Sequence, residues 1–260
     1  ANNLKQIGLA IQHYIEKHEM FPPMRYSGGT FDVAWSFRIL PFLEQQAIFD
    51  AHHWGTDCYA PQNAVAMQTP VPTYFNPSRR KPQATCIWEP NPPSPYWSGG
   101  SFNLQPGVAA CGDYAANAGS DIINDFFKPR TSGPISSLYS PPKLYQVVPA
   151  MVRDGLSNTL LVGDRWIGPP PPGNLPNGGQ HCDYAFYSGD NPFTIARGSR
   201  YGFPTGRDDT SVEKFGNPEG VQACFVLCDG SVRWLNYSMS LDVYKALSTS
   251  AGGETISDGP

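Results

Sequence analysis

Oxygen-bearing side chains gather around a predicted turn at residues 154–158. Asp154, Asn158 and Asp164 would supply carboxylate and amide oxygens there. Calcium binds about six to eight such oxygens in proteins, so these three residues form a candidate calcium site, although their spacing matches no EF-hand. The alternative is turn chemistry, in which Asp and Asn side chains bond their own backbone.

Aromatic side chains in proline-rich segments offer a second kind of site. Trp88, Tyr96, Trp97 and Trp166 carry large rings with an apolar face, on which sugar rings can stack. These four residues are a candidate glycan-binding set. Packing of the same rings against neighbouring prolines is the alternative interpretation.

The sequence carries no recognisable catalytic motif. None of its five histidines belongs to an H-E-x-x-H pair, and neither a G-x-S-x-G elbow nor a glycine-rich phosphate loop is present. His181 and Cys182 are adjacent, but neighbours on a strand point to opposite faces, so adjacency does not make them a dyad. The net charge of -4 argues against nucleic acid as a partner. We therefore expect a non-enzymatic protein.

Six cysteines stand at positions 58, 86, 111, 182, 224 and 228. None forms a C-x-x-C pair, which argues against a structural zinc site. An even number favours disulfides in an exported chain, and we expect at least two; six buried thiols in a cytosolic protein are the alternative. Cys224 and Cys228 lie on one face of a predicted strand about 13 Å apart. A disulfide allows roughly 7 Å between Cα atoms, so these two should not pair.

The elements that position these residues begin with an amphipathic helix. Its apolar stripe recurs at three- and four-residue steps and consists of Leu4, Ile7, Ile11 and Tyr14. The helix is expected to run already at residue 1 and to end near Glu19, which suggests that an upstream part was removed or left out. Near the other end, residues 221–228 and 231–236 read as two strands. They are joined at Asp229-Gly230, a two-residue turn with positive φ expected at both positions.

A leading helix followed by antiparallel hairpins is typical of an α+β fold. The helix must bury its stripe, and the predicted sheet is the available surface. Glycine and proline, with 26 and 27 residues, make up about a fifth of the chain and predict long loops. We expect residues 1–20 to be helix and residues 21–260 to form a single globular head. No apolar run approaches the roughly 18 residues of a membrane span.

Six short segments follow one another in a characteristic order. They are residues 2–10 with Phe21-Pro22-Pro23, residues 35–46, residues 71–78 (VPTYFNPS), residues 113–119 (DYAANAG), residues 154–159 (DGLSNT) and residues 228–233 (CDGSVR). Together they resemble the planctomycete-type pilin-like family known as domain of unknown function 1559. The resemblance implies a pilin-like helix laid across an antiparallel sheet with large loop insertions. It also implies a prepilin-type leader and an upstream hydrophobic helix that anchors the protein before export.

Two positions depart from the family pattern. The family is often marked by a histidine ahead of an Asp-Gly pair, and here Glu219 stands ten residues before Asp229. Asn76 stands where the family usually has a cysteine, so any family disulfide through that position is lost.

These features predict an exported, non-enzymatic structural subunit of a surface filament, a lattice or a secretion apparatus. Leu4, Ile7, Ile11 and Tyr14 would serve assembly, with copies of the chain or related pilin-like subunits as partners. Membrane contact would come only through the upstream helix. The alternative is a cell-surface module that binds a glycan or another solute.

Overall fold

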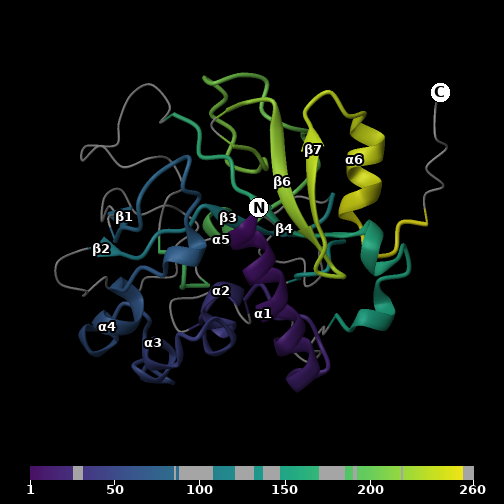
Figure 1. Ribbon diagram of the computed structural model, residues 1–260. Coiled ribbons are helices and arrows are strands. Elements are labelled where there is room, and N and C mark those ends of the chain that lie inside the picture. The colour runs from purple at the N-terminus through teal and green to yellow at the C-terminus, as the bar shows by residue number, and fades with distance from the viewer. Residues whose placement is uncertain are drawn as a thin grey trace.

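The computed structural model describes residues 1–25, 32–84, 86–87, 108–120, 132–136, 147–169, 185–189, 192–217 and 219–253 (Figure 1). One long helix, α1 (Asn2–His18), lies against a sheet. In the described residues this sheet has five strands: β3 (Tyr114–Asn117), β4 (Leu160–Asp164), β5 (Ala196–Arg197), β6 (Gln222–Leu227) and β7 (Val232–Asn236). The arrangement confirms the expected α+β fold.

Shorter elements surround this framework. The helices are α2 (Trp35–Arg38), α3 (Gln46–Asp50), α4 (Ala64–Gln68), α5 (Pro192–Ile195) and α6 (Leu241–Ser248). Single 3-10 turns lie at η1 (Leu40–Leu43), η2 (Pro61–Asn63), η3 (Pro72–Tyr74), η4 (Pro149–Met151) and η5 (Leu156–Asn158), and β1 (Cys86–Ile87) pairs with β2 (Val108–Ala109). In the part of the chain that is described, no helix combines the length and the apolar character that a membrane crossing needs.

The apolar stripe of α1 is buried, as its spacing predicts. Leu4, Ile7, Ile11 and Tyr14 all lie in the hydrophobic core, and the helix ends where Glu19 adopts a left-handed conformation. Each buried side chain of this size contributes roughly 1.5–3 kcal/mol to stability. These four residues were also expected to serve assembly, but their side chains are covered by this chain itself and do not form an exposed contact surface.

Close packing between α1 and the sheet depends on Gly8. A Cβ atom at this position would come within 2.5 Å of Val226 Cγ2 on β6. That distance is far below van der Waals contact, so only glycine lets the helix backbone approach this closely. Lys5 and Gln12 add polar contacts beside it, donating hydrogen bonds from their side chains to the backbone carbonyls of Gly230 and Cys228 at 2.8 Å.

The sheet has the strand order β5-β3-β4-β6-β7. Every neighbouring pair is antiparallel except β3 and β5, which run parallel with Ala116 opposite Ala196. The expectation of a purely antiparallel sheet was wrong for this pair. The physical reason is the strand order: β4 runs antiparallel to β3, and β5, which follows β4 in the chain, begins at the edge of the sheet where β4 ends and lies on the far side of β3, so it runs parallel to β3.

The two faces of the sheet pack against different helices. Cys224 and Val226 of β6, and Cys228 directly after it, belong to the core beneath α1, whereas alternate residues of β6 on the opposite face belong to the core beneath α6. This opposite face includes Phe225, and the Tyr244 ring of α6 stacks on Phe203 with 4.2 Å between ring centroids. Figure 1 shows α1 and α6 on the two sides of the β6–β7 hairpin.

The β6–β7 hairpin turns in a way that differs from the prediction. Only Gly230 has a positive φ, 81°, whereas Asp229 does not. The Gly230 N–H donates to the Leu227 carbonyl at 2.9 Å, so Cys228 and Asp229 are the central residues of the turn, and Gly230 follows them. Asp229 is held by its own side chain, whose Oδ1 accepts the Ser231 N–H at 2.8 Å. Such a turn with a left-handed glycine after it is the usual three-residue alternative to the two-residue loop.

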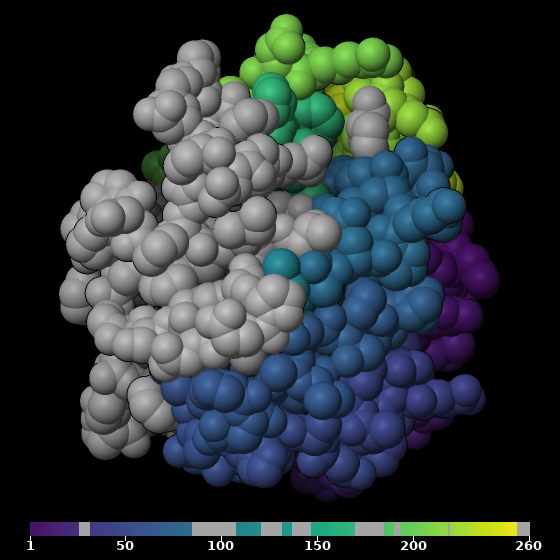
Figure 2. All heavy atoms as spheres, turned by 90° about the vertical axis from the view of Figure 1, so that its left-hand side faces the viewer, coloured from purple at the N-terminus to yellow at the C-terminus, as the bar shows by residue number. Residues whose placement is uncertain are grey.

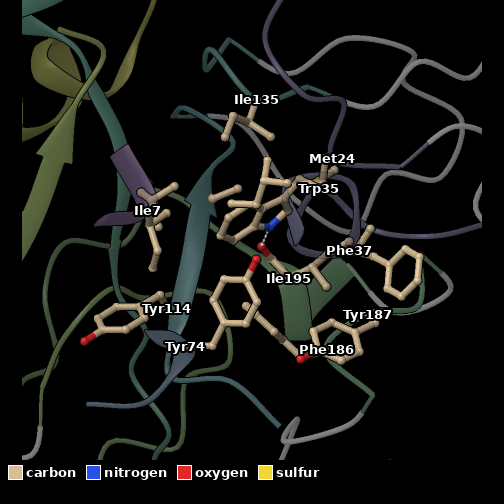
Figure 3. Close-up of a cluster of buried hydrophobic side chains, with 14 of the residues drawn as sticks. Ile7, Met24, Trp35, Phe37, Tyr74, Tyr114, Ile135, Phe186, Tyr187 and Ile195 are labelled. Atoms are coloured by element: carbon tan, nitrogen blue, oxygen red, sulfur yellow. Dashed lines mark hydrogen bonds between the residues drawn. The ribbon is translucent and has the colours of Figure 1, made fainter. Parts of the chain in front are cut away.

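An aromatic cluster joins the segment after α1 to the sheet. The Trp35 indole N–H donates to the Ile195 carbonyl at 2.7 Å (Figure 3). The Tyr74 hydroxyl donates to the Ser36 carbonyl at 2.5 Å. The rings of Trp35, Tyr74 and Phe186 meet edge to face, the geometry that aromatic pairs prefer. From the side shown in Figure 2, residues 32–84 form a broad surface that reaches α1 at one margin.

Three of the six cysteines, namely Cys58, Cys224 and Cys228, are buried thiols that form no disulfide. Cys111 is disulfide-bonded. Because three thiols outside disulfides leave three other cysteines, the chain has room for one bridge, and the expectation of at least two disulfides was wrong. Cys224 and Cys228 are unpaired, as their separation along one strand predicts.

Candidate functional site

The residues of the predicted calcium site are not brought together. The Asp154 carboxylate accepts the N–H groups of Gly252 and Gly253 at 2.8 and 3.0 Å, and Asn158 donates to the Asp154 carbonyl. Asp164 lies at the far end of β4, about 20 Å along the chain from Asn158 at ~3.3 Å per residue. No group of three or more His, Cys, Asp or Glu side chains is placed to hold a metal ion within the described residues. Asn158 takes the turn-forming role that was the alternative, whereas the Asp154 carboxylate ties this turn to the distant residues Gly252 and Gly253.

One member of the predicted glycan-binding set, Trp166, is buried. Trp166 is only 4% exposed, and its indole N–H donates to the Asp209 carbonyl at 2.7 Å, so its ring is not available for stacking. Trp88, Tyr96 and Trp97 lie outside the described residues. Two described tryptophans that the sequence did not single out are half-exposed, namely Trp54 at 53% and Trp234 of β7 at 50%.

A pocket of about 300 Å³ lies beside the first turn of α1. Its wall combines side-chain amides, two carboxyl groups and two aromatic rings. The amides belong to Asn2, Asn3, Asn76 and Asn217, the carboxyl groups to Asp164 and Glu219, and the rings to Tyr114 and Trp234. Among the described residues that line it, none is a lysine or an arginine. The pocket therefore offers many hydrogen-bonding groups and a negative charge.

Asp164 is the most buried charged group of the pocket, with 2% of its surface exposed. One carboxylate oxygen accepts the Cys224 N–H at 2.9 Å, and the other accepts the Asn76 side-chain amide at 3.3 Å. Burial raises the pKa of Asp164 to about 6, against a smaller opposite effect of these hydrogen bonds and of Arg79. The group is therefore mostly ionised at neutral pH, and it becomes protonated in mildly acidic solution.

A buried ion-pair network holds the loop that carries Asn76. Asp113 is fully buried, and its carboxylate lies 2.6 Å from Arg80 Nη2 and 3.8 Å from Arg79 Nη1. The other oxygen of Asp113 accepts the Asn76 N–H at 2.9 Å. Breaking a buried ion pair of this kind is costly because it leaves an uncompensated charge. Asp113 thereby fixes the loop so that the Asn76 side chain meets Asp164.

The opposite wall of the pocket comes from the C-terminal third of the chain. The Asn217 N–H donates to the Tyr237 hydroxyl at 2.8 Å, and Asn217 Oδ1 accepts the Glu219 N–H at 2.9 Å. Glu219 is thus carried on a small side-chain-capped turn, and its carboxylate is exposed to solvent. Trp234 is the cross-strand partner of Cys224 and shares its face of the sheet.

The cysteine of this region has no nucleophilic character. Burial raises the pKa of the Cys224 thiol to about 11. Burial likewise raises the pKa of the Cys228 thiol far above its ordinary value. Only the thiolate is a strong nucleophile, so these residues contribute packing to the α1 core.

Sequence reasoning assigned Asp164 to a different site and gave no role to Asn76, Tyr114, Glu219 or Trp234. The sequence nevertheless contained a signal for this pocket, because the segments that carry the family resemblance supply most of the residues that line it. They include residues 2–10, 71–78 and 113–119, and Glu219 occupies the position at which the family often has histidine. Segments far apart in the sequence thus meet at one pocket.

Comparisons with known proteins agree with the resemblance. No curated protein and no solved structure matches this chain. One family model does match, over residues 1–242, and its description is "Protein of unknown function (DUF1559)". Because this match covers nearly the whole sequence, the chain belongs to the DUF1559 family.

Proposed function

We propose that the chain is an exported, non-enzymatic, pilin-like structural subunit that assembles with copies of itself or with related subunits. The observation that carries the proposal is the arrangement of α1. Its inner apolar stripe is buried against the sheet, whereas its outer face is exposed to solvent in the described structure. The resemblance of the six ordered segments to pilin-like proteins favours the same interpretation.

The outer face of α1 has one prominent apolar residue. Leu9 is 46% exposed and stands among exposed polar side chains that include Lys5, Gln6 and His13. A leucine covered in a subunit contact would contribute roughly 1.5–3 kcal/mol per subunit. The exposed polar residues around it would form the hydrogen-bonded rim of the contact.

Substitution of Leu9 tests this proposal, and the chain offers a matched control. Leu9→Glu should reduce the fraction of the complete protein that sediments as assemblies by about tenfold, because a carboxylate would be desolvated in every contact. Leu241→Glu should not, since Leu241 is a similarly exposed leucine, 41%, on α6 at the other side of the sheet. Both variants should keep the melting temperature of the wild type.

Equal sedimentation of Leu9→Glu and the wild type would contradict a contact through α1. A loss of assembly in Leu241→Glu alone would place the contact on α6 instead.

The second candidate function is the binding of a small solute. Stacking of a glycan on Trp166 is excluded by its burial, but the pocket beside the first turn of α1 favours solute binding for a different reason. Its walls converge on a cavity of a size suited to a small molecule.

A further inference from the structure

We propose that the outer edge of β7 pairs with the same strand of a second copy of the chain, so that the sheets of two copies join across a two-fold axis. The contact uses a surface other than the outer face of α1, and it stands whether or not subunits also meet through α1.

The strand order leaves β7 at one margin of the sheet. Within the described residues, β7 pairs with β6 alone, and its other side carries no strand. The helices α1 and α6 lie on the two sides of the β6–β7 hairpin, and neither crosses β7 in Figure 1. In the described part of the chain, β7 is therefore an edge strand.

The hydrogen bonds at the two ends of the hairpin show which backbone groups point away from β6. The Leu227 N–H donates to the Ser231 carbonyl at 2.8 Å, and the Tyr237 N–H donates to the Val221 carbonyl at 3.0 Å. Hydrogen-bonded and non-hydrogen-bonded pairs alternate along an antiparallel ladder. Every second residue from Ser231 to Tyr237 therefore bonds to β6, and the backbone groups of the residues in between point away from it.

Val232 and Trp234 are two of these in-between residues, so their N–H and C=O groups lie on the outer side of β7. The N–H of Cys224, which is the cross-strand partner of Trp234, accordingly donates to Asp164 and not to β7. Among the described residues, none bonds to the backbone of Val232 or Trp234 on the outer side. A row of unpaired N–H and C=O groups on an edge is a template for another strand.

β7 has few of the features that prevent sheet edges from pairing. Natural edge strands are protected by proline, by bulges, by charged side chains or by a covering segment. β7 contains no proline, and Arg233 is its single charged residue. Its register with β6 runs without a shift from Val232 to Asn236. The edge is regular enough to pair over its whole length.

The side-chain order of β7 suits an antiparallel copy of itself. If Trp234 lies opposite its counterpart in the second copy, Val232 lies opposite Asn236, and Arg233 lies opposite Leu235. No like charges are then directly opposite, whereas parallel pairing in register would place the two Arg233 side chains side by side. The two tryptophans form a central aromatic pair of the kind that stabilises sheets. A two-fold axis through this pair closes the contact, so the product is a dimer.

Amide hydrogen exchange of the complete protein tests the pairing residue by residue. In the monomer, the N–H groups of Val232 and Trp234 should exchange at least about tenfold faster than those of Arg233 and Leu235, which bond to β6. Protection of Val232 and Trp234 should appear as the concentration rises into the dimeric range. Fast exchange at both positions in a dimer, or protection that is the same at every concentration, would overturn the inference.

A synthetic peptide with the sequence of residues 231–237 separates backbone pairing from side-chain contacts. In the antiparallel arrangement its Trp234 N–H faces β7 of the protein, whereas its Arg233 N–H faces away. Methylation of the Trp234 nitrogen should weaken binding of the peptide at least about tenfold, and methylation of the Arg233 nitrogen should not. Equal effects of the two methyl groups, or no binding of the unmodified peptide, would show that β7 does not accept a strand.

Substitutions on the complete protein supply matched controls. Trp234→Lys places two ammonium groups opposite each other and should raise the dimer dissociation constant at least about tenfold in analytical ultracentrifugation. Trp54→Lys should leave this constant unchanged, since Trp54 is a similarly exposed tryptophan, 53%, outside the sheet. Leu9→Glu should also leave it unchanged, so failure of this inference and failure of the assembly proposal can be told apart. A Trp234→Lys protein that dimerises as the wild type does, or a wild type that stays monomeric throughout, would contradict pairing through β7.

Discussion

The Asp164 carboxylate accepts the backbone N–H of Cys224 at 2.9 Å, which links the end of β4 to the middle of β6. This bond lies where the first turn of α1, the loop that carries Asn76 and the β6–β7 hairpin meet. It places a buried carboxylate in the sheet framework, and the ionisation of this carboxylate can be measured through its effect on stability.

Ionisation of Asp164 should make stability depend on pH. Burial raises its pKa from 3.8 to about 6 in the folded protein, so the folded state holds the proton more tightly than the unfolded state between these values. The penalty for burying the ionised group is therefore complete above about pH 6, and it disappears as the pH falls toward 4. A shift of this size corresponds to about 2–3 kcal/mol as an order of magnitude.

Asp164→Asn removes this titration. Urea unfolding of the variant and the wild type should give a difference in unfolding free energy that favours the variant more at pH 7.5 than at pH 4.5. A difference that stays constant across this range would show that Asp164 is not a buried titrating group.

The contact between Gly8 and Val226 should appear as energetic coupling. Gly8→Ala should destabilise the protein by about 1–3 kcal/mol because the new methyl group overlaps Val226, even though alanine favours the helix by about 1 kcal/mol. Adding Val226→Ala should recover part of this loss, since the smaller side chain makes room. A double-mutant cycle measured by chemical denaturation reports the coupling. Strictly additive effects would mean that α1 does not press on β6 at this point.

Two leucines of α1 should differ sharply in their effect on stability. Leu4 is fully buried, and Leu4→Ala should cost about 2–5 kcal/mol through lost burial and a residual cavity. Leu9 is 46% exposed, and Leu9→Ala should change the unfolding free energy of the monomer by less than about 1 kcal/mol. Thermal unfolding of both variants at a concentration where the protein is monomeric provides the comparison. Similar losses in both would contradict the orientation of the helix.

The hairpin turn should tolerate a change at Asp229 and resist one at Gly230. Asp229→Asn retains the oxygen that accepts the Ser231 N–H and should be nearly neutral. Gly230→Val forces a β-branched residue into a left-handed conformation and should cost about 1–3 kcal/mol. Melting curves decide between these outcomes. A folded Asp229→Asn protein that lost a measured function would show that the turn has more than a structural role.

Local patterns made part of the fold predictable. The stripe of Leu4, Ile7 and Ile11 follows from helical periodicity, and Asp229-Gly230 marks a hairpin because few residues suit such a turn. The parallel pairing of β3 with β5 could not be predicted, since it depends on the path of a long connection. The turn type was wrong because the side chain of Asp229 bonds to Ser231 and favours the three-residue form.

The candidate site was less predictable because its residues come from distant segments. Asp164 and Asp154 are close in the sequence, but the extended strand β4 separates them, so they do not meet at one calcium site. Asn76, Glu219 and Trp234 come together only through sheet register and the ion pairs of Asp113. Trp166 looked like an exposed ring, but the Asp209 carbonyl satisfies its indole N–H and its ring is buried.

The assembly proposal is tested most directly by electron micrographs of the complete protein at increasing concentration. The account predicts ordered filaments or a lattice in which the outer face of α1, with Leu9, lies in the contact between subunits. Single particles at every concentration, or an ordered array in which that face of α1 is exposed to solvent, would contradict it.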